Sequence, residues 1–321
     1  MNLERLQICC VALMLLVAPA TVAEDDLQGS GSKPPASGSS GEISTARFEG
    51  YLWKDADGNP LSFQSDEAIE EFLRTASVVS SSKIGTGVTQ PRKLLLAAND
   101  VRIHAVFKDV DVTRRDVREK TAGRAKFYRY WRDWHLYDVA AYHVDRLFGL
   151  DRVPPAVRRK VRRKDGSVKI WLEGTVMDTY RHDQAIQPPS IARWNQQRQI
   201  MHIFDNLVAN RDSNLGNILI DGSWRLWFID CGRCFGESSE LLYPETITHC
   251  DRGLWNAMRN LDEIEVRRRL SPYLTRYEID AMLGRRDKVV AHLEELIDKW
   301  GEEHVLFDLL PTTEPAPWAE H

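Results

Sequence analysis

Two short segments decide how this chain folds: Asn210-Arg211-Asp212-Ser213-Asn214-Leu215-Gly216-Asn217, and then Ile229-Asp230-Cys231-Gly232. An amphipathic helix formed by apolar residues between positions 200 and 208 leads into the first segment. A predicted hairpin follows, with strands at Ile218–Ile220 and Trp224–Ile229 and a turn at Asp221-Gly222-Ser223. The second aspartate lies 230 − 212 = 18 residues after the first. The order is therefore helix, loop, hairpin and Asp-x-Gly.

This order supplies the side chains that phosphoryl transfer requires. Asp212, at the end of a helix, can accept or orient a substrate hydroxyl, and Asn217 lets the loop turn back onto a metal ion. Asp230 can bind the metals that bridge nucleotide phosphates. The pattern resembles the H-R-D-x-x-x-x-N and D-F-G elements of kinases, with Asn210 in place of His and Cys231 in place of Phe. Taken alone, Asp-x-Gly is an ordinary turn, so the prediction rests on the succession.

A strand lysine and an acidic partner are also expected. His104-Ala105-Val106-Phe107-Lys108 ends a predicted strand and looks like the V-A-I-K element, so Lys108 is a candidate catalytic residue that binds phosphate. Asp138, on a helix predicted over Tyr128–Phe148, is the candidate that orients it. The alternative for Asp138 is a surface acid or a local pair with Arg132. An aspartate here, shorter than the usual glutamate, would have to bring its helix nearer the lysine.

Two further segments are candidates for nucleotide binding. Gly85 and Gly87 lie in Ile84-Gly85-Thr86-Gly87-Val88, a turn whose backbone amides can face phosphates. An ordinary bend is the alternative. Leu172 and Glu173 precede Gly174 between the two halves, where a hinge would present backbone groups to adenine.

The remaining segments predict an α+β fold. Lys93–Ala97 and Val101–Phe107 are expected strands, joined by Asn99-Asp100. A hairpin is expected over Ala156–Arg162 and Ser167–Leu172, turning at Asp165-Gly166. Roughly Tyr273–Asp308 is charged and helical. We therefore expect two lobes, a strand-rich N-lobe over 48–173 and a mostly helical C-lobe over 174–310, followed by a tail over 311–321.

Composition and the N-terminus bound the class of protein. Of 321 residues 43% are hydrophobic, and 43 basic against 47 acidic residues give a net charge of −4, which excludes a polyelectrolyte or a polybasic nucleic-acid arm. Residues 1–23 read as a cleaved signal peptide, with an uncleaved anchor as the alternative, and the Gly/Ser/Pro-rich 24–47 as a linker. We expect a secreted or periplasmic protein, or one in the secretory-pathway lumen. It should have no membrane span after cleavage and no nucleic-acid partner.

Three cysteines remain after such cleavage: Cys231, Cys234 and Cys250. An odd number excludes a disulfide scaffold, but one bridge among the three is possible in an oxidising compartment. A zinc site using these residues with His249 is a minor alternative, because the spacing is unlike that of known structural sites. The sequence does not choose between them.

The residues resemble the secretory-pathway kinases of the Golgi casein kinase and four-jointed type, which are atypical relatives of protein kinases. The resemblance covers roughly Ser77–Asp308 and rests on four segments: Val106-Phe107-Lys108, Val139-Ala140-Ala141-Tyr142 continuing to Val153-Pro154-Pro155, Asn210-Arg211-Asp212, and Ile229-Asp230-Cys231-Gly232-Arg233 followed by Phe235. It implies a two-lobed kinase fold that binds ATP with Mg²⁺ or Mn²⁺. Asp212, Lys108 and Asp138 would be catalytic, Lys108 would bind phosphate, and Asp230 and Asn217 would bind the metal.

We accordingly expect an exported ATP-dependent kinase that transfers the γ-phosphoryl group to a hydroxyl. The resemblance implies a secreted or extracytoplasmic protein or glycan as the acceptor, and protein Ser/Thr is preferred. Two alternatives stay open. One is a pseudokinase that binds nucleotide as an interaction module, and the other is a secreted sugar or small-molecule kinase. The oligomeric state is not predicted.

Overall fold

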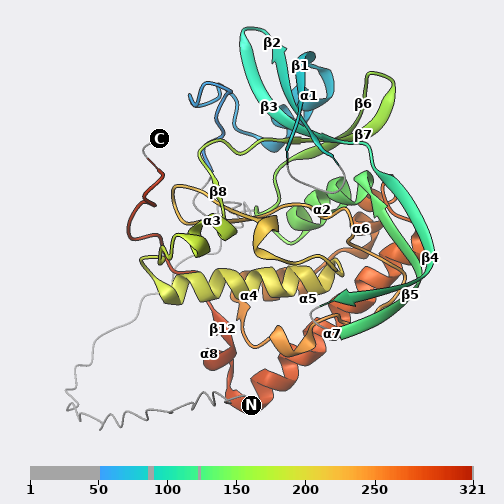
Figure 1. Ribbon diagram of the computed structural model, residues 1–321. Coiled ribbons are helices and arrows are strands. Elements are labelled where there is room, and N and C mark those ends of the chain that lie inside the picture. The colour runs from blue at the N-terminus through green and yellow to red at the C-terminus, as the bar shows by residue number, and fades with distance from the viewer. Residues whose placement is uncertain (1–50, 86–89, 122–123, 320–321) are drawn as a thin grey trace, which may run out of the picture. The chain divides into compact units, whose positions relative to one another are not determined.

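The computed structural model describes residues 51–85, 90–121 and 124–319 (Figure 1). The expected signal peptide, linker and Gly87 lie outside the described residues. The described chain opens with a five-stranded antiparallel sheet in the order β1-β2-β3-β7-β6. Its strands are β1 (Ser77–Lys83), β2 (Arg92–Ala98), β3 (Val101–Lys108), β6 (Ala156–Val161) and β7 (Lys164–Ile170).

One face of this sheet is covered by α1 (Asp66–Thr75) (Figure 1). Ser65 caps the helix by accepting a hydrogen bond from the backbone N–H of Ala68. Its buried side chains join a core of alternate strand residues, because successive side chains of a strand point to opposite faces. That core includes Ile69, Phe72, Leu73, Leu94, Leu96, Ile103, Phe107 and Val168.

The β6–β7 hairpin turns three residues earlier than the sequence suggested. Arg162 and Arg163, both at positive φ (48° and 66°), make the turn, and Gly166 lies inside β7. A Cβ at Gly166 would lie 2.3 Å from a ring carbon of Phe107 and 2.4 Å from the carbonyl oxygen of Lys108. Glycine is needed here because β7 lies directly beside the end of β3, where a side chain would overlap Phe107 and the Lys108 carbonyl, and not because the chain turns.

The helix expected over Tyr128–Phe148 is wrong in its first third. β4 (Asp111–Thr121) and β5 (Arg124–Trp134) form a long antiparallel hairpin, and α2 (His135–Leu147) begins only after it. Aromatic residues favour the strand, and pairing along β4 satisfies the backbone of β5. The hairpin leaves the sheet and runs alongside the helical half (Figure 1).

The second half is mostly helical, so the expected mixed fold with a strand-rich N-terminal part is confirmed. Its helices are α3 (Asp178–Asp183), α4 (Ile191–Leu207), α5 (Arg252–Arg259), α6 (Glu263–Leu270), α7 (Arg276–Trp300) and α8 (Glu302–Val305), with single turns at η1 (Leu215–Asn217) and η2 (Pro244–Thr246). Helices α4 and α7 contact each other, and their buried side chains belong to one large core that also includes α2.

Short strands complete this half. β8 (Val176–Met177), β9 (Ile218–Ile220) and β10 (Leu226–Phe228) form a small sheet, and β11 (Cys250–Asp251) pairs with β12 (Leu306–Phe307). The tail packs against the β9–β10 turn, because the backbone N–H of Ala316 donates to the carbonyl of Gly222 at 2.8 Å. The predicted hairpin before Asp230 is present, with the loop at 221–225.

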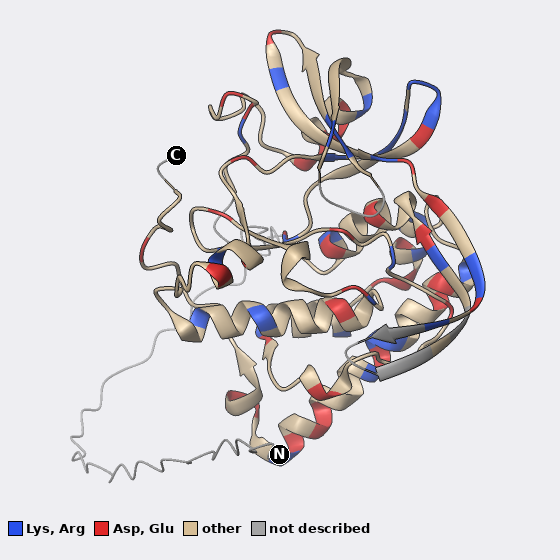
Figure 2. Ribbon diagram, in the orientation of Figure 1, with Lys and Arg blue, Asp and Glu red and all other residues tan. Residues whose placement is uncertain are grey.

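Charge is unevenly distributed over the two halves (Figure 2). Basic residues gather at the end of the β6–β7 hairpin, whereas acidic and basic residues alternate along α7. Within the described ranges, no helix combines the length and the apolar character needed to cross a bilayer.

Candidate functional site

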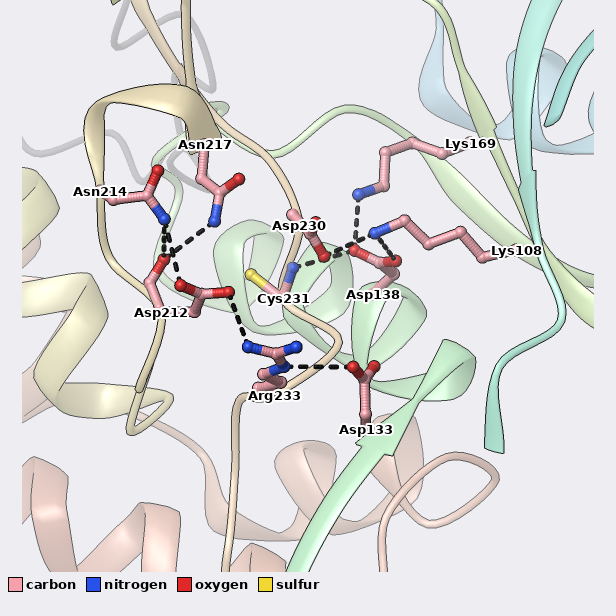
Figure 3. Close-up of polar contacts among 10 residues, drawn as sticks. All are labelled: Lys108, Asp133, Asp138, Lys169, Asp212, Asn214, Asn217, Asp230, Cys231 and Arg233. Atoms are coloured by element: carbon pink, nitrogen blue, oxygen red, sulfur yellow. Dashed lines mark hydrogen bonds and ion pairs between the residues drawn. The ribbon is translucent and has the colours of Figure 1, made fainter. Parts of the chain in front are cut away.

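Lys108 is held by two carboxylates that come from distant parts of the chain. It is the last residue of β3, and 8% of its side chain is exposed. Its Nζ lies 3.1 Å from Oδ2 of Asp138 on α2 and 2.6 Å from Oδ1 of Asp230 after β10 (Figure 3). Burial disfavours the charged amine, but the two carboxylates outweigh this and raise the pKa of Lys108. Three residues predicted from sequence therefore meet.

Asp138 is fully buried between two ammonium groups. Besides Lys108, its Oδ1 accepts from Nζ of Lys169 at 2.6 Å and from the backbone N–H of Cys231 at 3.1 Å. Burial alone would raise the pKa of this carboxyl, yet the charges of Lys108 and Lys169 lower it well below its ordinary value. The aspartate thus reaches the lysine directly despite its short side chain. The alternative pair with Arg132 is absent, because Arg132 binds Asp111 instead.

Sequence reasoning missed Lys169. It lies on β7 opposite Val106, flanked by the buried Val168 and Ile170, and is itself 6% exposed. A lysine between apolar strand residues is unusual, because a buried ammonium needs a charged partner. A lysine between two apolar residues of a predicted buried strand was therefore the feature of the sequence that could have identified Lys169.

Asp230 stands in an uncommon backbone conformation at the end of the β9–β10 hairpin. Its φ is 62°, a region that non-glycine residues seldom adopt. The N–H of Ile229 donates to the carbonyl of Asn217 at 3.0 Å, so the residues before and after the hairpin lie side by side. The Asp230 side chain remains 44% exposed. One side of this carboxylate therefore binds Lys108 while the rest can take a ligand.

The Asp212 loop is organised by amide and carboxylate side chains. Nδ2 of both Asn214 and Asn217 donates to the carbonyl of Asp212 at 2.9 Å. Beneath the loop, Asp205 accepts from Asn210 at 2.8 Å and from the hydroxyl of Ser213 at 2.6 Å. Burial raises the pKa of Asp205 to about 6, against the opposing effect of these hydrogen bonds. Hydrogen bonds thus hold the carbonyl of Asp212 itself and the residues on either side of it, Asn210 and Ser213.

Arg233 bridges two acidic side chains at the site (Figure 3). Its Nη1 lies 3.2 Å from Oδ2 of Asp212, and its Nε donates to Oδ2 of Asp133 at 3.1 Å. Burial raises the pKa of Asp133, while Arg233 opposes that shift. Neither Arg233 nor Asp133 was predicted as a site residue. Arg233 follows the Asp-x-Gly element directly, whereas Asp133 had no signal because its strand was taken for a helix.

Asp230 and Asn217 fit a hard divalent cation. Within the described part of the chain, Asn217 uses its amide nitrogen on Asp212 and its Oδ1 makes no hydrogen bond. Carboxylate and amide oxygens suit Mg²⁺, which is commonly held by one or two carboxylates together with substrate phosphates. Among the described residues no group of three His, Cys, Asp or Glu side chains could hold a metal by itself. A cation here would need phosphate oxygens to complete its shell.

The remaining predicted residues lie apart from this cluster of charges. Gly85 is exposed just after β1, with open space where a Cβ would stand. The Glu173 carboxylate pairs with Nδ1 of His104 at 2.6 Å, and its carbonyl accepts from the hydroxyl of Tyr51 at 3.2 Å. The adenine-binding role of Leu172 and Glu173 stays a prediction. The side chains of Cys231, Cys234 and Cys250 are buried, and the three form no disulfide with one another.

A cavity of about 680 Å³ lies elsewhere, between α3, α4 and η1. Asp178, Arg181, Trp194 and Arg198 line it, and none of the side chains that surround Lys108 does. It plays no part in the site described above.

Comparison with known proteins identifies the fold. No protein-family model matches the sequence, and no curated protein matches it. Among solved structures, hydra Fam20 with sugar has a TM-score of 0.57 at 17% identity, covering 77% of this chain and 94% of that one. The Golgi casein kinase has a TM-score of 0.53 at 18% identity, covering 77% and 80%. Its Mn/ADP complex also gives 0.53 at 18%, covering 76% and 78%. The chain therefore has the atypical kinase-like fold that the sequence predicted.

Proposed function

We propose that this kinase-like chain is an ATP-dependent kinase that transfers the γ-phosphoryl group to a hydroxyl. The observation that carries the proposal is the contact of Lys108 with both Asp138 and Asp230, at 3.1 and 2.6 Å. Positioning and charge stabilisation supply most of the catalysis in phosphoryl transfer. A lysine fixed between a helix carboxylate and an Asp-x-Gly carboxylate meets that requirement.

Each residue then has a defined task. Lys108 binds phosphate oxygens, and Asp138 keeps its ammonium group charged and oriented. Asp230 and Asn217 hold Mg²⁺ or Mn²⁺, which neutralises charge on the phosphates when bound. Asp212 accepts the proton of the acceptor hydroxyl, and Arg233 fixes its carboxylate by the contact at 3.2 Å. With Asp230 engaged by a cation, Lys108 would be free to leave that carboxylate and face phosphate.

The test is nucleotide binding followed by transfer. Calorimetry with ATP and Mg²⁺ or Mn²⁺ should show binding that depends on the metal, and Asp230→Asn should abolish that dependence. Asp183→Asn is the matched control, because Asp183 is 74% exposed on α3. Radiolabelled ATP should then label an acceptor from a panel of proteins and sugars. Binding of ATP without transfer to any acceptor would indicate a pseudokinase. An unchanged affinity for ATP and metal in Asp230→Asn would refute the metal site.

We also infer that the protein acts outside the cytosol on a protein Ser/Thr hydroxyl. The apolar run near the N-terminus, followed by small residues, supports export. N-terminal sequencing of the protein recovered outside the cytosol should give a first residue near Glu24. Labelling of a sugar in preference to every protein of the panel would reassign the acceptor.

A further inference from the structure

The end of the β6–β7 hairpin carries a dense group of basic side chains (Figure 2). Six of the seven residues from Arg158 to Lys164 are Arg or Lys, although the whole chain has a net charge of −4. β6 is an edge strand of the five-stranded sheet, and five of the six basic residues are exposed. None of the six belongs to the site proposed for phosphoryl transfer.

Three of the six basic side chains have partners within the chain. Arg159 donates to two carbonyls at the end of α1, at 2.7 and 2.6 Å. Arg158 pairs with Asp165 at 2.6 Å. Lys164 pairs with Asp109, directly after β3, at 2.6 Å. Contacts inside the protein therefore account for half of the basic residues.

The other three basic residues are Lys160, Arg162 and Arg163, and all three are exposed. Within the part of the chain that the structure describes, none of them forms a hydrogen bond or an ion pair. Val161 is buried in the core beneath the sheet, so the alternation along β6 turns Lys160 toward the opposite face. Like charges this close together repel one another, and an anion that binds them removes the repulsion.

The backbone of the turn is a second, independent observation. Arg162 and Arg163 both have positive φ, at 48° and 66°. Two-residue turns of this kind favour Asn-Gly, because those residues tolerate a left-handed backbone. Charged side chains on an edge strand discourage pairing with another chain, but that role does not extend to the turn. Residues kept in an unfavourable conformation are typical of functional sites.

We propose that the end of the β6–β7 hairpin is a binding surface for a sulfated polysaccharide. Short runs of Lys and Arg are typical of surfaces that bind heparin-like polymers or nucleic acids. Guanidinium groups bind oxyanions by strong charge-assisted hydrogen bonds. Arg158 and Lys160 share one face of β6, about 7 Å apart along the strand. A linear polymer with sulfate groups along its length can contact this face and the two turn arginines together.

The hairpin lacks the side chains on which other anionic partners depend. The bases of single-stranded nucleic acid stack on aromatic rings, and residues 156–170 include no aromatic residue. Protein partners bury an apolar core, and membrane-surface helices insert apolar side chains. Every apolar side chain of the two strands is already buried within the protein. The surface therefore offers positive charge and hydrogen-bond donors alone, and a sulfated sugar chain is polar along its whole length.

The experiment measures the binding of heparin, a sulfated polysaccharide, to the full chain by calorimetry over a series of salt concentrations. The variant Lys160→Gln/Arg162→Gln/Arg163→Gln removes the three basic groups that have no partner. Its affinity for heparin should be about 10- to 100-fold lower than that of the wild type at about 0.15 M salt. The affinity should also depend less steeply on salt, because fewer counterions are released on binding. A wild-type protein that does not bind heparin at this salt concentration would overturn the proposal.

The matched control is Arg259→Gln/Arg276→Gln/Lys299→Gln, which removes the same charge from exposed positions of the helical half. Its affinity for heparin should stay within about twofold of the wild type, because charges far from the contact are largely screened by salt. An equal loss of affinity in the two triple variants would show that heparin responds to net charge, and would refute the hairpin as the binding surface.

A further variant separates binding from folding. Arg162→Asn/Arg163→Gly gives the turn the residues that its backbone favours, so the melting temperature should rise while the affinity for heparin falls. A purely structural role for the two arginines predicts that the melting temperature falls instead. Unchanged heparin affinity in this variant would exclude the turn from the binding surface.

Three other polyanions test the choice of partner. Duplex DNA, polyglutamate and phosphatidylserine vesicles are titrated at the same concentration of negative charge as heparin. Heparin should bind more tightly than all three, and tighter binding of any one of them would reassign the surface to that class of partner. Because no step uses ATP, a failure of the proposed kinase activity and a failure of this proposal are distinguished by separate measurements.

Discussion

The lysine cluster and the Asp212 loop form the two sides of the same site, yet they are built by opposite means. Lys108, Asp138 and Lys169 are buried, with side-chain exposures of 8%, 0% and 8%. In the loop, by contrast, Asp212 is 41% exposed and Asn214 and Asn217 hydrogen-bond mainly to its backbone. The cluster is fixed by ion pairs between buried side chains, whereas the loop is held mainly by hydrogen bonds from amide and hydroxyl groups, with the Asp212 side chain exposed to water.

This difference predicts that the buried cluster matters most for stability and the exposed loop most for turnover. The buried charges must be paired for the protein to fold, because an uncompensated buried charge costs several kcal/mol. The exposed carboxylates can change partner at little cost, because water screens them. Substitutions in the cluster should therefore act on stability first, and substitutions in the loop on turnover first.

The largest expected effect is that of Asp212→Ala on transfer. Loss of the group proposed to accept the hydroxyl proton should lower the rate about 10²- to 10⁴-fold. The melting temperature should change little, because the side chain is exposed. Labelling from radiolabelled ATP measures the first and thermal unfolding the second. Asp183→Ala is the control, and transfer at the wild-type rate in Asp212→Ala would contradict the proposed role.

Asp138→Ala should instead destabilise the protein. It leaves the ammonium groups of Lys108 and Lys169 buried without their shared carboxylate, and breaking a buried pair in this way costs about 3 to 5 kcal/mol. Denaturant unfolding measures the loss. The comparison is Asp111→Ala, which removes the exposed pair with Arg132 and should cost about 0 to 1 kcal/mol. If the two variants lose the same free energy of unfolding, the buried ion pairs do not contribute more to stability than the exposed pair.

The raised pKa of Asp205, beneath the Asp212 loop, should make the free energy of unfolding depend on pH. Its pKa in the folded state is raised from 3.8 to about 6, so the folded protein retains a proton that the unfolded chain has released. The free energy of unfolding should therefore fall by about 3 kcal/mol from this residue as pH rises from about 4 to about 6. Above that range its contribution is constant. Denaturant titrations at pH 4.5 and 7 measure this change in the free energy of unfolding, and the change should be smaller in Asp205→Asn. If the free energy of unfolding changes with pH as much in Asp205→Asn as in the wild type, Asp205 is not the source.

Gly166→Ala is the smallest of the expected effects. The added methyl would overlap the Phe107 ring and the Lys108 carbonyl, and overpacking of this kind costs about 1 to 3 kcal/mol. The overlap should also displace Lys108 together with its carbonyl, so the affinity for ATP should fall as the protein loses stability. Gly85→Ala serves as the stability control, since among the described residues no atom beyond its chain neighbours lies within 4 Å of the added methyl. If both variants unfold at the wild-type denaturant concentration, the close approach of the two strands is not a constraint.

Sequence patterns predicted the parts of this molecule in which local chemistry decides the structure. The helix before Asp212, the hairpin before Asp230 and the strand ending at Lys108 all follow from periodicity and turn residues. Order along the chain then brought Lys108, Asp138 and Asp230 into one prediction, and the structure places their side chains in contact.

The failures occur where distant contacts decide. Tyr128 to Trp134 have a pattern compatible with helix, and only pairing with β4 makes them a strand. Gly166 looked like a turn residue because its true constraint, the Phe107 ring, is remote in sequence. Lys169 and Arg233 entered the site through partners 31 and 21 residues away, which no local pattern reveals.

The packing of the tail has a practical consequence for any shortened version of this protein. Trp318 lies against Trp224 with ring centroids 5.1 Å apart, and the Thr312 hydroxyl donates to the carbonyl of Ser223. Asn217 and Asp230 stand at the open end of that same hairpin, one before β9 and the other after β10. Truncation at residue 310, or a bulky fusion that lifts the tail, would uncover the Trp224 ring at the closed end and loosen the spacing of the two proposed cation ligands. We therefore expect residues 311–319 to brace the hairpin that carries the two proposed metal ligands.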